Sequence, residues 1–157
     1  MEDLKKYIAE HPFFENMIPE YLDTIVGCAS NVRFNAGDFL FREGQTANQF
    51  FLIRHGKVTL EIYVPSRGPF IIETAEAGDV LGWSWLFPPY RWHFDARVQE
   101  LTRAIAMDAT CLREKKEADP ALGYNLMQRF ARVMEQRLQA TRLQLADVYG
   151  NPVAHSR

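Results

Sequence analysis

Short apolar segments, each bounded by turn-forming residues, fill the middle of this 157-residue chain. Residues 58–64 alternate apolar and polar side chains, which is typical of a strand with one buried face. The glycine and proline turns between the segments favour antiparallel hairpins over alternating strand–helix units. The pattern therefore predicts a mainly β fold, a β-roll or jelly roll (double-stranded β-helix) with flanking helices. Further strands are expected at Phe39–Phe41, Phe50–Ile53, Phe70–Thr74, Ala96–Gln99 and Ala104–Met107.

Helical spacing replaces this alternation on both sides of the β region. Before it, Leu4 and Ile8, and later Leu22 and Ile25, recur three or four residues apart. After it, Asp119-Pro120 supplies a helix N-cap followed by proline at the first helical position. We expect one domain with an N-terminal helical segment at 1–31, the roll at 32–108, C-terminal helices at 109–149 and a tail at 150–157.

The last predicted helix carries apolar residues at heptad-like steps of three and four. From Asp119 to Tyr149 it would be about 45 Å long, more than a roll of this size needs for its own packing. Its apolar stripe either packs on the roll or pairs, in its second half, with the same helix of another subunit. We favour a homodimer, with an interface at Phe130, Met134, Leu138, Thr141, Leu145 and Val148.

Charge and cysteine content narrow the class of protein. A net charge of −2 gives no basic face of the kind that binds nucleic acid. No apolar run is long enough to cross a membrane, and the first residues lack a signal peptide, so we expect a cytoplasmic protein. Cys28 and Cys111 form no metal-type pair, and we expect both to be reduced and buried.

Catalytic and metal-binding patterns are absent from the sequence. It contains no nucleophile elbow, P-loop, dinucleotide fingerprint or catalytic cysteine signature. Only His55 and His93 of the four histidines fall in the β region, far apart, which leaves haem ligation as the one metal-type alternative. We therefore expect neither an enzyme nor a metal site.

Five glycines in the segments AGDFLFREGQTANQFFLIRHGKVTLEIY and AGDVLG give the chain a family likeness. The pattern Gly37, Gly44, Gly56, Gly78 and Gly82 resembles the cyclic nucleotide-binding domain, the sensor half of catabolite-activator-type regulators. The likeness covers roughly residues 12–149. It implies a β-roll with a ligand pocket inside, a cyclic nucleotide as ligand, and the long helix as a dimer axis. The DNA-binding domain of such regulators is not expected in the few residues after Tyr149.

Residues 82–96, here called the cassette segment, correspond to the part of the family that binds the cyclic phosphate. The resemblance implies a glutamate for the ribose hydroxyl, then an arginine for the phosphate, a small hydroxyl residue and an alanine. Trp83 stands at the glutamate position, and aligning Ala96 with the alanine puts Phe94 at the arginine and Asp95 at the hydroxyl residue. A like charge about 4 Å from the phosphate costs several kcal/mol, so we expect no conventional binding of cAMP.

Other arginines could compensate for the missing one. Arg91 lies in the cassette loop and either enters the pocket or, as we favour, stays in solvent. Arg97 alternates with buried neighbours and should face outward.

Residues 137–141 resemble the helical stretch that reaches into the family's pocket, where the arginine pairs with the cassette glutamate and the threonine touches the purine. Because Trp83 replaces that glutamate, Arg137 either stacks on the indole, awaits an anionic ligand or lies on an exposed helix face. Arg142 adds a further positive charge beside Thr141.

Aromatic residues are dense in the cassette segment, at Trp83, Trp85, Phe87, Tyr90, Trp92 and Phe94. We rank core filling first, a pocket for a flat ligand second and a patch for a partner protein third.

The sequence therefore predicts a stand-alone, non-catalytic regulatory or sensor module. One alternative is a working sensor of a cyclic nucleotide or other small anion that uses Arg91, Arg137 and Thr141. Another is a subunit that docks a protein partner through residues 83–94. The candidate pocket residues are Gly82, Trp83, Ser84, Arg91, Phe94, Asp95, Ala96, Arg137 and Thr141.

Overall fold

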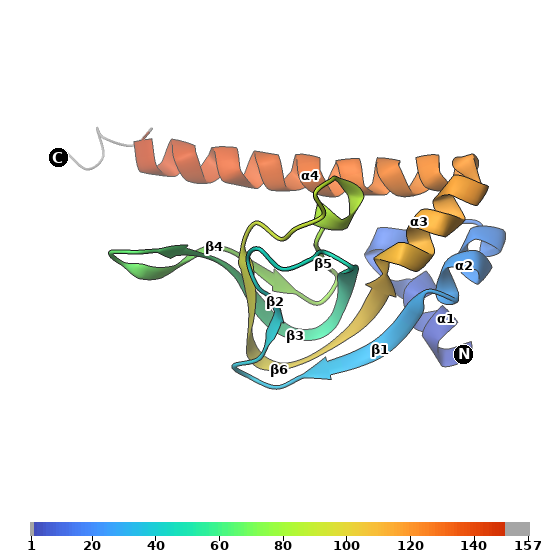
Figure 1. The fold of residues 1–157 in the computed structure, drawn as a ribbon, viewed down its shortest axis with the longest axis horizontal. Helices are drawn as coiled ribbons and strands as arrows, with labels where there is room; N and C mark the ends of the chain where they lie inside the picture. Colours follow the sequence, from blue (N-terminus) through green and yellow to red (C-terminus); the bar gives the residue numbers. More distant parts are fainter. Residues whose placement is uncertain (1, 150–157) are drawn as a thin grey trace.

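A computed structural model describes residues 2–149 of the chain and shows a β-roll with helices at one end and the long helix along one side (Figure 1). The N-terminal segment forms α1 (Glu2–Glu10), the short 3-10 helix η1 (Pro12–Phe14) and α2 (Pro19–Val26). The strands are β1 (Ala29–Phe34), β2 (Phe39–Phe41), β3 (Gln49–Val64), β4 (Gly68–Glu76), β5 (Val80–Leu81) and β6 (Asp95–Asp108). The 3-10 helix η2 (Ser84–Leu86) precedes β6, and α3 (Ala109–Ala118) and α4 (Pro120–Tyr149) follow it.

All strand pairs in the roll are antiparallel, and the main sheet runs in the order β1-β6-β3-β4, with β2 on β6 and β5 on β3. The predicted roll with flanking helices is confirmed. The separate strands expected at 50–53 and 58–64 form one strand, β3, whose register with β6 is irregular on both sides of Gly56. Gly56 has φ +112°, and a Cβ there would lie 2.3 Å from Oγ1 of Thr102. Only glycine therefore lets the two long strands pass so closely.

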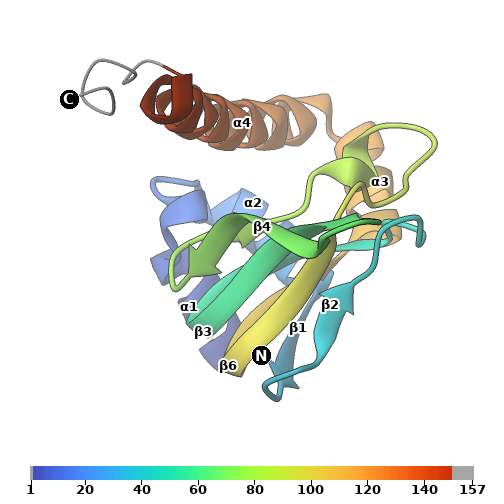
Figure 2. The same cartoon turned by 90° about the vertical axis from the view of Figure 1, so that its left-hand side faces the viewer.

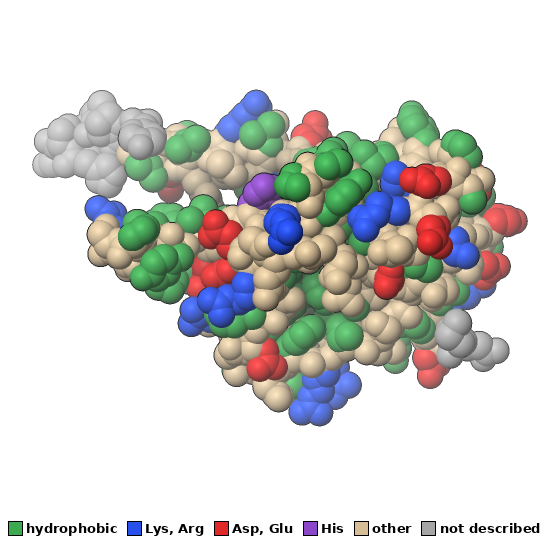
Figure 3. Space-filling model, viewed as in Figure 1, with side chains coloured by type: hydrophobic (Ala, Val, Ile, Leu, Met, Phe, Trp, Pro, Cys, Tyr) green, Lys and Arg blue, Asp and Glu red, His purple; other side chains and the backbone are tan. Residues whose placement is uncertain are grey.

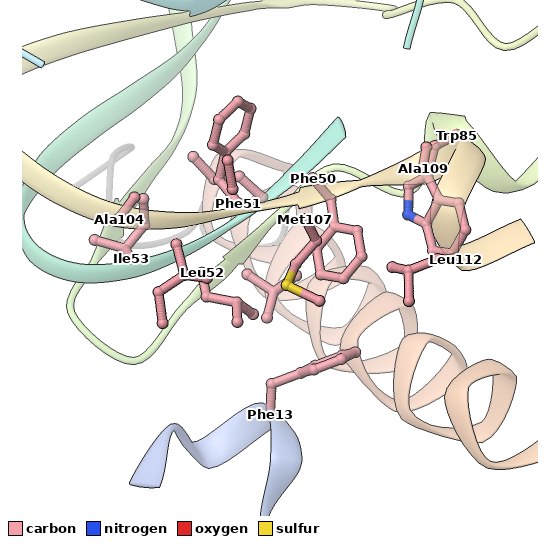
Figure 4. Packing of buried hydrophobic residues seen from close by; sticks show 14 of the residues in the cluster. Phe13, Phe50, Phe51, Leu52, Ile53, Trp85, Ala104, Met107, Ala109 and Leu112 are labelled. Carbon is pink, nitrogen blue, oxygen red and sulfur yellow. The ribbon is translucent and has the colours of Figure 1, made fainter. Parts of the chain in front are cut away.

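Aromatic rings from several elements meet in the core, some of them shown in Figure 4. The ring of Phe130 on α4 lies 4.8 Å from that of Phe13 on η1 and 5.0 Å from that of Phe50 on β3. Trp85 of η2 stacks on Phe50 at 5.3 Å. These edge-to-face and stacked pairs fix α4 and the cassette segment on the same core.

His11 positions η1 beneath α4. Its Nδ1 accepts a hydrogen bond from the backbone N–H of Phe13 (3.2 Å), and its Nε2 lies 3.3 Å from the carbonyl of Ile53. A neutral ring can satisfy both contacts, with Nε2 as the donor. Burial lowers the pKa of His11, although the Ile53 carbonyl and Asp79 oppose this effect.

Helix α4 has a buried first half and an exposed second half. Asp119 caps it through a hydrogen bond from the N–H of Leu122 to its carboxylate (3.2 Å). Leu122, Leu126 and Phe130 are fully buried, whereas every described side chain beyond Arg137 is exposed. Assigning Phe130 to a dimer interface was therefore wrong, because its ring fills the core of its own subunit.

Cys28 and Cys111 form a disulfide, so the expectation of reduced thiols was wrong. Cys28 directly precedes β1, and Cys111 lies in the first turn of α3. The β1–β6 ladder ends at Ala29 opposite Met107, and the N–H of Asp108 donates to the carbonyl of Cys28 (2.8 Å). Strand pairing thus brings the two Cα atoms to 5.6 Å, which suits a disulfide.

No helix within residues 2–149 combines the length and the apolar character that crossing a membrane requires.

Candidate functional site

The site predicted from the sequence lies where α4 passes over the open end of the roll, with β4 below it and the cassette segment on one side (Figure 2). Three parts of the chain meet there: β4, the cassette segment and the middle of α4. The structure tests whether their side chains leave room for a nucleotide and a cation for its phosphate.

An indole ring covers Gly82, the first residue of the cassette segment. Gly82 has φ +101°, and a Cβ there would lie 2.4 Å from the ring of Trp92. Trp92 is buried and stacks on Phe41 of β2, with ring centroids 3.7 Å apart and an interplanar angle of 10°. The space over the Gly82 backbone is thus filled by the protein's own side chain.

Asp95, whose negative charge we expected near the phosphate, contacts the turn that follows β2. Asp95 accepts a hydrogen bond from the N–H of Glu43 (2.7 Å) and lies 3.7 Å from Nε of Arg42. Phe94 packs against Phe41 at 5.8 Å, and Ala96 is fully buried. The three residues at the expected arginine, hydroxyl and alanine positions therefore supply no free cation.

Arg91 stays at the surface, as the sequence favoured. Its side chain is exposed and donates to the carbonyl of Gly44 (2.9 Å). The N–H of Gly44 donates in turn to the carbonyl of Trp92 (2.9 Å). Arg91 therefore fastens the cassette loop to the turn after β2 and does not enter the roll.

The aromatic residues of the cassette segment mostly fill the core. Trp85 and Trp92 are buried, and so is Ser84, which directly precedes Trp85 at the start of η2. Trp83 is only half-buried and faces α4. Of the three interpretations of the aromatic density, core filling describes two of the three tryptophans.

Arg137 of α4 contacts the cassette segment at Trp83. Its guanidinium carbon lies 5.0 Å from the centre of the Trp83 ring, which agrees with the predicted stacking alternative. Its Nη1 lies 3.1 Å from a carboxylate oxygen of Glu73, and its Nη2 donates to the carbonyl of Val80. We call these four residues the Arg137 cluster.

Burial controls the charges in the Arg137 cluster. The Arg137 side chain is 16% exposed and that of Glu73 is 29% exposed. Burial lowers the pKa of Arg137, and Glu73 and Asp79 oppose that effect. Burial also raises the pKa of Glu73 more than its pairing with Arg137 lowers it, and Asp79 raises it further.

Thr141, the other candidate on α4, lies one turn beyond Arg137. It is exposed, and its hydroxyl donates to the carbonyl of Arg137 (2.8 Å). Of the nine candidate residues, only Trp83 and Arg137 contact each other across the site through their side chains.

Glu73 is the member of the cluster that sequence reasoning missed. Glu73 pairs with Leu60 of β3, and Leu60 pairs on its other side with Ala96 of β6. The three residues therefore share the inner face of the roll. The register shifts between Glu73 and Ile71, and this irregularity puts Glu73 on the same face as Phe70. Simple alternation would place these two residues on opposite faces.

A groove of about 790 Å³ runs along α4, between the helix, η1 and the turn from β4 to β5, and Glu73, Val80 and Arg137 of the cluster line it. Both acidic and basic side chains line it, among them Glu15, Asp79 and Arg132. Among the candidate residues from the sequence, only Arg137 borders the groove. The groove therefore includes most of the Arg137 cluster but not the cassette segment, where the resemblance places the phosphate.

Arg97 faces away from the inner surface, as expected. It pairs with Thr59 across the ladder, one position out of phase with Ala96 and Leu60. Its Nε lies 3.4 Å from a carboxylate oxygen of Glu61.

The described residues show no metal-type arrangement. His55 and His93 are exposed, and residues 2–149 contain no group of three or more His, Cys, Asp or Glu side chains that could hold a metal ion.

Comparison with known proteins places this geometry in a family. The model of the cyclic nucleotide-binding domain matches residues 31–119, more than half of the chain. A CRP-like cAMP-activated global transcriptional regulator of Mycobacterium tuberculosis is 24% identical over 145 residues, which is 92% of this chain and 63% of that protein. The chain thus spans less than two thirds of that relative's length.

Solved structures show the same fold. A cyclic nucleotide-binding protein of Geobacter metallireducens superimposes with a TM-score of 0.76 at 27% identity, covering 85% of this chain and 97% of that one. The sensor domain of the transcriptional regulator DNR from Pseudomonas aeruginosa gives a TM-score of 0.70 at 17% identity, covering 88% of this chain and 95% of that one. The chain therefore belongs to the cyclic nucleotide-binding domain family.

Proposed function

We propose that this chain is a non-catalytic regulatory module of its family whose site does not bind cAMP in the usual way. The observation that carries the proposal is the side chain of Trp92, which lies over Gly82 and fills the space where the backbone would face a phosphate. Opening that space would break the stacked pair of Trp92 and Phe41. A ligand would have to replace this buried aromatic contact before it gained any affinity.

Electrostatics supports the same proposal. A cyclic phosphate is a monoanion, and anion sites in proteins combine arginine with backbone N–H groups. On the cassette side, Arg91 is bound to the carbonyl of Gly44, and the carboxylate of Asp95 is bound to the N–H of Glu43. The cassette segment therefore offers an anion no free arginine, and it carries the negative charge of Asp95.

Calorimetry with cAMP and cGMP tests the proposal directly. We expect no saturable heat for either nucleotide at micromolar concentrations, because each would need to displace Trp92 without a cation to receive its phosphate. A Trp92→Ala variant is the matched comparison, since it opens the space over Gly82 and leaves the charges unchanged. Submicromolar binding of cAMP or cGMP to the natural chain would refute the proposal.

A homodimer through the second half of α4 is the second part of the proposal. Leu138, Leu145 and Val148 are 49%, 52% and 69% exposed and follow the heptad-like spacing. Thr141 lies on the same stripe, and Met134, which is half-buried, begins it. A helix with such an apolar stripe is stabilised by pairing with a second copy of itself.

The hairpin of β3 and β4 extends this apolar surface. Ile62, Tyr63, Phe70 and Ile71 are exposed near its tip, and hydrophobic side chains gather over that end of the molecule (Figure 3). Ile62 and Phe70 pair across the strands on the face that carries Leu60. The hairpin reaches out on the same side as the free end of α4 (Figures 1 and 2), so we assign both to one interface.

The two alternatives from the sequence receive less support. A sensor that uses Arg91 would need that side chain to leave the Gly44 carbonyl and cross the loop. A partner-binding loop would need exposed tryptophans, but Trp85 and Trp92 are buried.

A further inference from the structure

We propose that Glu73 is an internal ligand of Arg137 and determines that the site rejects small anions. Its carboxylate occupies the position on the guanidinium that an anionic ligand would need. The inference deepens the proposed function and rests on it, because it concerns the helix side of the same site. It gives a second reason, at one residue of β4, why the site rejects small anions.

The geometry of Arg137 leaves little for an external anion. One terminal nitrogen lies 3.1 Å from the Glu73 carboxylate, and the other donates to the Val80 carbonyl. The Trp83 ring covers the guanidinium at 5.0 Å. A guanidinium binds carboxylates and phosphates through such paired donors, so a ligand would have to displace Glu73 to use them.

The pair of Glu73 and Arg137 is more buried than an ordinary surface ion pair, since the two side chains are 29% and 16% exposed. Glu73 shares the inner face of the roll with Leu60 and Ala96, both of which are buried. A buried charge is costly unless it is paired, and loss of one partner leaves the other uncompensated. Arg137 and Glu73 therefore depend on each other, and the vacated place should accept another small anion.

Asp79 is the other acid close enough to affect Arg137. Its carboxylate accepts a hydrogen bond from the N–H of Glu76 (2.8 Å), which holds the turn between β4 and β5. Asp79 thus has a structural partner of its own, and Glu73 alone forms a salt bridge with Arg137 among the described residues.

Chemical rescue tests the inference. In the Glu73→Ala variant, we expect the melting temperature to fall by about 3–8 °C, because Arg137 loses its counter-ion. Sodium acetate, compared with sodium chloride at equal concentration, should restore at least half of that loss. Acetate should give the natural chain no advantage over chloride, since its site is already filled.

Two further variants separate a bound anion from general salt effects. The Glu73→Ala, Arg137→Gln double variant should lose the acetate effect, because no guanidinium remains to bind it. Glu76→Ala removes an exposed acid from the same strand and is the matched control, with no acetate effect.

The outcomes are decisive in either direction. An acetate effect that is absent in Glu73→Ala, or that persists without Arg137, overturns the inference. If Glu73→Ala does not fold in either salt, Glu73→Gln replaces it, and a melting temperature equal to that of the natural chain then overturns the inference too. Binding of cAMP to the natural chain would instead refute the proposed function, so the two failures are distinguishable.

Discussion

Both halves of α4 carry apolar residues at helical spacing, but the two halves have opposite environments. In the first half, Leu122, Leu126 and Phe130 are buried against the roll. In the second half, Leu138 and Leu145 lie seven residues apart, two helical turns, and remain exposed. The spacing of apolar residues predicts that a helix face is buried. Only the fold shows whether the same subunit or a second one buries it. Arg137, the last partly buried residue of α4, marks the boundary.

The largest expected effect belongs to the buried half. Phe130→Ala should lower the free energy of unfolding by about 3–5 kcal/mol, because it removes a ring that touches Phe13, Phe50 and Trp85. Urea unfolding followed by circular dichroism measures the change. Leu143→Ala, at a side chain that is 71% exposed, is the control and should change stability by less than about 0.5 kcal/mol. Equal losses in both variants would abolish the contrast between the halves.

The exposed half should govern assembly rather than folding. The double variant Leu138→Glu, Leu145→Glu places like charges on the proposed seam and should shift the protein from dimer to monomer. Analytical ultracentrifugation at several concentrations measures the mass, and circular dichroism should show an unchanged roll. Leu143→Glu lies off the seam and should leave the dimer intact. If the natural chain is monomeric at the highest concentration, the proposed interface is wrong.

The smallest effect should be a pH dependence at His11, which supports η1 beneath the buried half. Since the folded pKa of His11 is lowered, folding favours the neutral ring. Stability from this group is then fully present above the unfolded value of about 6.5 and is lost as pH falls from there through the folded pKa. Urea unfolding at about pH 7.5 and about pH 5.5 should show this loss, and His11→Gln should reduce the slope. An unchanged slope in the variant would assign the pH dependence to other groups.

Much of the fold can be predicted from the sequence, because hydrophobic spacing and turn residues determine where most helices and strands lie. Phe39–Phe41 and Pro120–Tyr149 are a strand and a helix with the predicted bounds. The strands at 96–99 and 104–107 merge into β6, since the chain continues through the ladder without a turn. These differences arise because glycine and polar residues occur both at irregularities inside a strand and at turns between strands, so the sequence does not distinguish the two.

The site was less predictable, because it depends on contacts between distant segments. Arg137 and Trp83 could be paired from the resemblance, but Glu73 could not, since the register shift in β4 changes which residues face inward. The closure of Trp92 over Gly82 depends on Phe41, which comes from a third part of the chain. Cys28 and Cys111 are 83 residues apart, and only the pairing of β1 with β6 brings them together.

The Cys28–Cys111 bond encloses all six strands in one covalent ring and leaves α4 outside it. A protease cut at the exposed turn of the β3–β4 hairpin would open the backbone of this ring without releasing a fragment. The nicked chain would keep its full mass until a thiol reagent separated the two pieces. The ring therefore preserves the pairing of strands on either side of a cut, while the helix that emerges from it stays free to meet another molecule.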